Sequence, residues 1–256
     1  MTPDGPRQTR PRASRRDPVV VHLVSYPRSG NTLVREYLSI LQGRAQTSVY
    51  DGDVVQATGP ALTHALDHVA FVKSHQLPAD DLPMVYLVRD GRNATLSFLY
   101  MSFLFGGHPY SELSEAYEGI VRLDAAEGPW AEHVEDALRQ SAVRRTLFIR
   151  YEDLVARPEA ALASMIGFVN ARVPVAALRE CVRRRERSSR YADNPYNGFL
   201  YQPAEGSIYD ILKRNRRADY WRHILDRRTR RYLHDRGATE MLLRFGYERS
   251  ADWWRD

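Results

Sequence analysis

The chain has 256 residues, of which 43% are hydrophobic and 27% charged, and its formal net charge is +5. This balance is typical of a soluble globular protein with one sizeable core. No apolar run approaches the ~20 residues that a membrane-spanning helix needs, so no transmembrane span is expected. No apolar segment of signal-peptide type follows the charged N-terminus. The single cysteine cannot form an intramolecular disulfide, which favours a cytoplasmic location.

The positive charge raises the question of a nucleic-acid partner. Five of the arginines lie within residues 1–17, a proline-containing leader whose composition predicts disorder. A folded basic surface holds a small polyanion equally well, so we expect no nucleic-acid partner. We expect two segments, a disordered basic leader over residues 1–17 and one domain over residues 18–256.

Short apolar runs alternate with helical patterns along the chain. Four runs predict buried parallel strands, at Val19–Val24, Val69–Val72, Met84–Val88 and Thr146–Ile149. Helical periodicity is present in four stretches, at Thr32–Leu41, Asn93–Phe103, Glu159–Val169 and Val175–Arg187. The alternation predicts an α/β fold, a single domain with a central parallel sheet flanked by helices.

The turn after the first predicted strand reads YPRSGNT, residues 26–32. A strand, a glycine-containing turn and a helix point backbone N–H groups and the positive helix end at one spot, which suits phosphate or sulfate. Polar donors surround Gly30 on both sides: Arg28, Ser29, Asn31 and Thr32. A plain strand-to-helix turn with a Ser/Thr cap is the alternative interpretation. The Gly-Lys pair of the nucleotide-triphosphatase loop is missing, so an anion without a dedicated magnesium serine fits better.

This turn resembles the 5′-phosphosulfate loop of sulfotransferases that use PAPS (3′-phosphoadenylyl sulfate), whose usual form is Y-P-K-S-G-T-T-W. Four later segments resemble the same family in the same order: VKSH (72–75), LVRDGRNATLSF (87–98), IRYEDLVARPEAAL (149–162) and RNRRADYW (214–221). The resemblance covers residues 19 to about 247. It implies a PAPS-dependent sulfotransferase with a P-loop-like phosphosulfate-binding loop after the first strand, PAPS as co-substrate and PAP as product.

The resemblance also implies a co-substrate site. By this resemblance, the 3′-phosphate of PAPS is expected to be held by Arg89, by Ser97 eight residues later, and by Arg214. The remaining positions implied to bind PAPS are Arg28, Ser29, Gly30, Asn31, Thr32, Leu33, Tyr151, Asn215 and Arg216. The chain departs from the family pattern in three places. Arg28 replaces the usual Lys, Leu33 replaces a Trp that stacks on adenine, and RNRR lacks the family's Gly.

Lys73 and His75 are the predicted catalytic pair, together with Arg28. Only Lys73 and Lys213 among the 37 basic residues are lysines, which makes each of them worth examining. Residues two apart on a strand point the same way, and at the carboxyl end of a parallel sheet that direction is the ligand crevice. A hydrogen-bonded structural histidine is the alternative. The resemblance places a general base at His75, with Lys73 and Arg28 stabilising the transferring sulfonate. The scheme requires no metal.

The acceptor is expected to be a small molecule with a hydroxyl group. Three loops are the candidate acceptor segments, at Tyr50–His68, Tyr100–Trp130 and Ser188–Asp210, and their aromatics favour a phenolic, lipidic or glycosylated molecule. A P-loop-like small-molecule kinase is one alternative function, and a non-catalytic nucleotide or nucleic-acid binder is another. A homodimer is left open. We expect five further residues to be structural: Arg92, Asn93, Glu152, Asp153 and Trp221.

Overall fold

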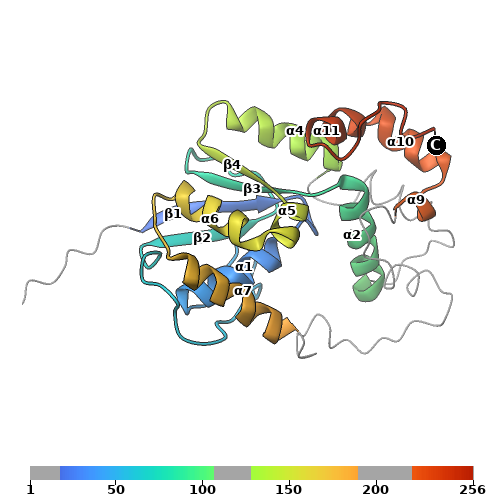
Figure 1. Cartoon of the computed structure of the whole chain (residues 1–256). Coiled ribbons are helices and arrows are strands. Elements are labelled where there is room, and N and C mark those ends of the chain that lie inside the picture. Colours follow the sequence, from blue (N-terminus) through green and yellow to red (C-terminus); the bar gives the residue numbers. More distant parts are fainter. Residues whose placement is uncertain (1–17, 107–127, 190–220, 256) are drawn as a thin grey trace, which may run out of the picture.

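The computed structural model describes residues 18–106, 128–189 and 221–255. In these residues four parallel strands form one sheet in the order β2-β1-β3-β4 (Figure 1). The strands are β1 (Val19–Ser25), β2 (Val69–Ser74), β3 (Met84–Val88) and β4 (Thr146–Arg150). Each of the four predicted apolar runs lies within one strand, and the predicted α/β fold with a central parallel sheet is confirmed. The predicted leader lies outside the described residues.

Helices cover both faces of the sheet (Figure 1). On one face lie α1 (Asn31–Gln42), α5 (Tyr151–Ala156), α6 (Pro158–Phe168) and α7 (Val175–Ser189). On the other lie α2 (Gly91–Gly106), α4 (Trp130–Ser141), α9 (Trp221–Ile224), α10 (Arg227–Asp235) and α11 (Ala238–Arg244). The four predicted helices correspond to α1, α2, α6 and α7. No helix in the described ranges is long and apolar enough to cross a membrane.

The continuous apolar runs follow from burial on both faces. Along β3, Met84, Tyr86 and Val88 pack into the core beneath α4 and α11. Val85 and Leu87 pack into the core beneath α1 and α6. Successive side chains of a strand face opposite sides of a sheet, so a strand covered on both sides must be apolar at every position.

The register brings the carboxyl ends of the four strands to one edge. Val24 of β1 is paired with Ser74 of β2, and Ser25 is paired with Leu87 of β3. Val88 is paired in turn with Arg150 of β4. β1 leads to β2 on one side of the sheet, whereas β3 leads to β4 on the other. In sheets of this kind, ligands bind in the crevice where the connections diverge, here between β1 and β3.

Candidate active site

The turn after β1 holds its backbone in the left-handed region at two positions. Arg28 has a φ of 67° and Gly30 a φ of 110°. Side chains other than glycine rarely adopt the Gly30 conformation. A Cβ atom at Gly30 would also lie 2.8 Å from Cδ2 of Tyr151. Backbone conformation and close approach therefore both require glycine at this position.

The start of α1 has the features of an anion site. Gly30 is its N-cap, no side chain caps this end by a hydrogen bond in the described part of the chain, and the first turn has no acidic residue. The first N–H groups of a helix have no acceptor within the helix, and its dipole makes this end positive. The hydroxyl of Ser29 is buried and has no hydrogen-bond partner among the described residues. The Ser29 hydroxyl and the first N–H groups of α1 are donors that together suit an anionic group such as a phosphosulfate.

Predicted PAPS-binding side chains from α2, α5 and the end of β3 meet at this turn. Arg28 Nε donates to Ser97 Oγ of α2 at 3.2 Å. Arg89, which follows β3, donates from Nη1 to the Arg28 carbonyl at 2.8 Å. The Arg89 guanidinium lies over the ring of Tyr151, 4.5 Å from its centroid. The structure therefore brings Arg28, Arg89, Ser97 and Tyr151 together, and their role in binding PAPS stays a prediction.

The other predicted residues of this turn differ in their surroundings. Asn31 is buried and donates from Nδ2 to Ser25 Oγ at 2.7 Å, which ties the helix start to the end of β1. Thr32 is exposed. Leu33 is half-buried and packs against the core beneath α1. Leu33 therefore contributes to packing, and its predicted place beside adenine remains untested.

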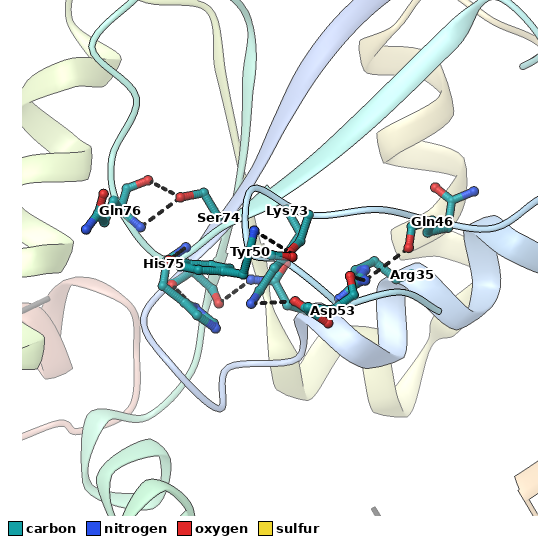
Figure 2. A network of polar contacts seen from close by, with 11 residues as sticks. Arg35, Gln46, Tyr50, Asp53, Lys73, Ser74, His75 and Gln76 are labelled. Carbon is teal, nitrogen blue, oxygen red and sulfur yellow. Dashed lines mark hydrogen bonds and ion pairs between the residues drawn. The ribbon is translucent and has the colours of Figure 1, made fainter. Parts of the chain in front are cut away.

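Lys73 and His75 both border one aromatic ring (Figure 2). Lys73 Nζ lies 4.3 Å from the centroid of the Tyr50 ring, and the His75 and Tyr50 ring centroids are 5.9 Å apart. β2 ends at Ser74, so His75 belongs to the following loop and strand alternation does not fix its direction. The Lys73 ammonium also donates to Asp53 Oδ2 at 2.9 Å, and its side chain is only 9% exposed.

The tautomer of His75 follows from its hydrogen bond. Nδ1 lies 2.9 Å from the carbonyl oxygen of Ser25. A carbonyl oxygen can only accept, so Nδ1 carries the proton and the lone pair of the neutral ring is on Nε2. Burial, followed by the charge of Lys73, lowers the pKa of His75 to about 4. The ring is therefore neutral at pH 7, and Nε2 is able to accept a proton.

A second histidine supports the loop that carries His75. His133 of α4 lies with Nε2 2.7 Å from the His75 carbonyl, so this nitrogen donates. Its Nδ1 accepts from the hydroxyl of Tyr86 at 2.7 Å. Burial lowers the pKa of His133, which favours the neutral ring that these two bonds need. His133 of α4 thus fixes the backbone at His75.

Sequence reasoning did not include Arg35 and His133 in this site, and it placed Tyr50 and Asp53 only within the predicted acceptor loop Tyr50–His68, without a role of their own. One of them had a signal in the sequence. Arg35 lies on the apolar face of α1, and a charged side chain in such a place needs a partner. The sequence does not say which carboxylate supplies it. In the structure Arg35 is 2% exposed and donates to Asp53 Oδ1 at 2.7 Å.

Arg92 and Trp221 have the structural roles expected from the sequence. Arg92 is buried and forms ion pairs with Asp90 at 2.6 Å and with Glu248 at 2.5 Å. Its guanidinium lies 3.8 Å from the centroid of the Trp221 ring, and Trp221 is 1% exposed. Trp221 in turn packs edge-on against Trp253. This cluster joins α2 to the C-terminal segment.

The acidic pair after β4 also has local roles. Glu152 accepts from the hydroxyl of Tyr247 at 2.8 Å, and burial raises its pKa. Asp153 forms an ion pair with Arg157 at 2.6 Å. Asn93 is half-buried at the start of α2. The contacts of Glu152 and Asp153 agree with the structural roles expected from the sequence, and the role of Asn93 stays a prediction.

Part of the predicted site lies outside the described residues. This applies to Arg214, Asn215 and Arg216, and to residues 107–127 and 190–210 of the predicted acceptor loops. Within residues 18–106, 128–189 and 221–255, no group of His, Cys, Asp and Glu side chains is arranged to hold a metal ion.

The chain is similar to known sulfotransferases. The model of the Sulfotransferase domain family matches residues 18–194. Sulfotransferase 1E1 of Homo sapiens is 25% identical over 206 residues, which are 72% of this chain and 69% of that protein. Sulfotransferase 1 family member D1 of Mus musculus is 21% identical over 222 residues, which are 77% of this chain and 75% of that protein.

Two solved structures share the fold. Mouse sulfotransferase SULT7A1, solved in complex with PAP, has a TM-score of 0.61 at 18% sequence identity, over 95% of this chain and 88% of that chain. Retinol dehydratase, solved with androsterone and the inactive cofactor PAP, also has a TM-score of 0.61, at 19% identity, over 88% of this chain and 81% of that chain.

Proposed function

This chain belongs to the sulfotransferase domain family, and from that premise we propose that it sulfates a hydroxyl group of a small molecule with His75 as general base. The family predicted from the motifs is confirmed. The chain is a PAPS-dependent sulfotransferase, and PAPS is its co-substrate. The catalytic residues and the kind of acceptor are the proposed part.

The observation that carries the proposal is the meeting of Arg28, Arg89 and Ser97 at the Gly30 turn. Two guanidinium groups and the positive end of α1 favour a ligand with several negative charges. PAPS supplies an activated sulfuryl group and, in PAP, a stabilised leaving group. We assign Arg89 and Ser97 to the 3′-phosphate and the turn to the 5′-phosphosulfate. Arg28 belongs to the turn and also contacts Ser97 and Arg89, which supports a position for it between the two ends of the ligand.

His75 is the proposed base because Nε2 of its neutral ring has a lone pair. This atom takes the proton of the acceptor hydroxyl as the oxygen attacks sulfur, and a positioned base contributes about 10²–10⁴ in rate. A pKa of about 4 makes the free ring a weak base. An anion at the neighbouring turn favours the charged imidazolium and raises this pKa. His75 therefore gains basicity only when the co-substrate site is filled.

Lys73 and Arg28 supply positive charge for the transfer. Negative charge grows on the bridging oxygen as the bond from sulfur to this oxygen breaks, and preoriented cations stabilise it. Arg28 keeps its proton at any working pH, so its role is electrostatic. Lys73 and His75 border the same Tyr50 ring, so the ammonium lies close to the proposed site of proton and sulfuryl transfer.

The acceptor side of the crevice includes the first predicted loop. Tyr50 begins that loop, and its ring borders both Lys73 and His75. An aromatic wall next to the base supports an acceptor with an apolar face, and we propose a phenolic, lipidic or glycosylated molecule. The other two predicted acceptor loops lie mostly outside the described residues.

Ligand-dependent thermal unfolding tests the co-substrate site. Full-length protein is heated with PAP, 5′-AMP, ATP or coenzyme A. A ligand at 100 times its Kd adds about 2.7 kcal/mol to stability, which raises Tm by ~5–10 °C for a domain of this size. We expect this shift with PAP and a much smaller one with 5′-AMP, which lacks the 3′-phosphate. An equal shift with ATP and PAP would count against the assignment.

Two arginine variants sharpen this test. Arg89→Ala removes a proposed 3′-phosphate ligand and is expected to abolish the preference for PAP over 5′-AMP. Arg157→Ala is the matched control, because it removes the same charge from an exposed side chain that pairs with Asp153. If both variants lose the preference equally, net charge and not the Arg89 contact explains binding.

Transfer of labelled sulfur tests catalysis. [35S]PAPS is incubated with 4-nitrophenol, a sterol, a long-chain alcohol and a phenolic glucoside, and labelled products are separated. We expect transfer to at least one of them, and a loss of about 10²–10⁴ in kcat for His75→Gln. PAP binding without transfer to any acceptor would favour the non-catalytic binder. Labelling from [γ-32P]ATP in place of PAPS would favour the kinase.

Three expectations accompany this proposal. A cytoplasmic location is consistent with Cys181, the single cysteine of the chain, which is buried and free. Whether the protein forms a homodimer stays open, and the absence of a nucleic-acid partner stays a prediction. Sedimentation analysis decides the first of these, and DNA binding across a salt series decides the second, because phosphate-driven binding weakens steeply with salt.

A further inference from the structure

A network of charged side chains, Arg35, Asp53 and Lys73, extends from the interior of the protein to the proposed site (Figure 2). The Asp53 carboxylate lies between two basic groups. Its Oδ1 accepts from Arg35 Nη1 at 2.7 Å, and its Oδ2 accepts from Lys73 Nζ at 2.9 Å. Neither Asp53 nor Arg35 has a part in the proposed reaction. Their contacts nevertheless end on one of its cations.

We propose that Asp53 is a positioning residue, which holds the Lys73 ammonium beside His75 in the orientation that sulfuryl transfer needs. This inference rests on the proposed function, because the value of a fixed ammonium comes from the negative charge it stabilises. Asp53 acts through Lys73 and needs no contact with the reacting atoms.

The anchor on the other side of Asp53 is rigid. Arg35 is 2% exposed and donates from Nη2 to two backbone carbonyls, of Asp53 at 2.6 Å and of Gln46 at 3.0 Å. A planar guanidinium with several donors fixes the geometry of its acceptors. Burial raises the pKa of Asp53, but hydrogen bonds from Arg35 and Lys73 outweigh it and lower the pKa to about 2. The carboxylate is therefore charged throughout the working pH range.

Tyr50 connects this network of charged side chains to the proposed base, His75. Its ring lies beneath the Lys73 ammonium, and its hydroxyl accepts from the backbone N–H of His75 at 3.0 Å. The ammonium is thus held from one side by a carboxylate and from another by an aromatic face. An ammonium over an aromatic face is attracted by the ring. Two fixed surfaces leave Lys73 little freedom to turn away.

The same arrangement sets the charge that His75 experiences. Five groups face its ring and backbone: the Lys73 ammonium, the Asp53 carboxylate, the Tyr50 ring, the Ser25 carbonyl and the His133 imidazole. Lys73 lowers the pKa of His75 and Asp53 raises it. Without the Asp53 charge the ammonium is displaced by about 1 Å but is still held over the Tyr50 ring near His75, where its charge is no longer balanced. This predicts a further decrease in the pKa of His75.

Asp53→Asn tests the proposal with little change in shape. The asparagine oxygen is still able to accept from Arg35, while its amide NH2 faces Lys73, which has only donors. We expect kcat to fall about 10–100-fold, the size of effect that misplacement by about 1 Å produces. The KM for PAPS is expected to stay the same, because Asp53 does not touch the predicted PAPS ligands. Asp53→Glu, which restores the carboxylate, should recover part of the loss.

A titration distinguishes positioning from a merely structural role. The pKa of His75 is followed by NMR of the imidazole, assigned with His75→Gln, in wild type and Asp53→Asn. A positioning role predicts a lower pKa in Asp53→Asn and an acid limb of kcat that moves to lower pH. A loosened fold predicts the opposite, since a more hydrated ring returns towards its ordinary pKa of about 6.5. The sign of the shift decides.

Asp51→Asn is the matched control. Asp51 is exposed and lies two residues from Asp53, so this substitution removes the same charge nearby. If Asp53→Asn and Asp51→Asn have the same kcat and the same His75 pKa, the proposal is wrong. Failure of the proposed function gives a different result. If the proposed function is wrong, wild-type protein shows no PAP-dependent rise in Tm and no transfer from PAPS. The His75 titration then still decides whether Asp53 controls the charge beside the ring.

Discussion

Replacement of Gly30 by alanine tests the phosphosulfate turn most directly. Gly30 has a φ of 110°, and its Cβ would lie 2.8 Å from Cδ2 of Tyr151. The left-handed backbone costs an L-residue about 1–2 kcal/mol. To relieve the contact, the Tyr151 ring must move, and the Arg89 guanidinium that lies over it loses a cation–π contact of about 0.5–1 kcal/mol. The free energy of unfolding should therefore fall by about 1.5–3 kcal/mol.

Gly52→Ala separates the two contributions. Gly52 also has a positive φ, of 74°, but a Cβ there would meet nothing within 4 Å. Its substitution therefore costs only the backbone term, about 1–2 kcal/mol. Both variants are unfolded in urea, and their Tm values are measured with and without PAP. We expect Gly30→Ala to be the less stable and to lose the PAP-dependent rise in Tm. Gly52→Ala should keep that rise.

One result would refute this reasoning. If Gly30→Ala and Gly52→Ala are equally stable and respond equally to PAP, the close approach to Tyr151 has no importance. The turn after β1 is then an ordinary strand-to-helix connection, which was the alternative interpretation of the sequence. Loss of stability in Gly30→Ala with an intact PAP response would support the steric argument and contradict the anion site.

Three further predictions concern acid stability, the cysteine and the buried arginine. Because burial lowers the pKa of His75 to about 4, the unfolded chain binds its proton first, at about pH 6.5. The stability due to the neutral ring is thus complete above pH 6.5 and is lost as the pH falls towards 4, by roughly 1–3 kcal/mol after allowance for solvent around a half-buried ring. Urea unfolding of His75→Gln should show a weaker pH dependence, and an unchanged dependence would contradict the assignment. Burial raises the pKa of Cys181 to about 12, so a disulfide reagent such as dithionitrobenzoate should label it only in urea, and rapid labelling of native protein would show that the thiol is reached from solvent. Arg92→Met leaves the buried Asp90 and the largely buried Glu248 without their guanidinium, and we expect a loss of about 3–5 kcal/mol in urea unfolding; a loss below about 1 kcal/mol would contradict this reading.

The sequence by itself determined the sheet and the glycine-containing turn after β1, for which phosphosulfate binding stays a prediction. Strands buried on both faces are apolar at every position, which made Met84–Val88 recognisable without a structure. The turn was recognisable because its chemistry is local: Arg28, Ser29 and Gly30 are neighbours in the chain. Arg89 and Ser97 belong to one strand-to-helix connection, so their spacing also carries the geometry.

Only the tertiary structure decided how the proposed catalytic pair, Lys73 and His75, is held. Asp53 meets Lys73 from 20 residues away, and His133 meets the His75 carbonyl from 58 residues away. Neither contact follows from a periodic pattern, because each joins a loop or helix to a strand end through packing. Strand alternation predicted a common direction for Lys73 and His75, yet β2 ends at Ser74. The two side chains lie together at the ring of Tyr50, which both of them border, and only the folded chain brings that ring there.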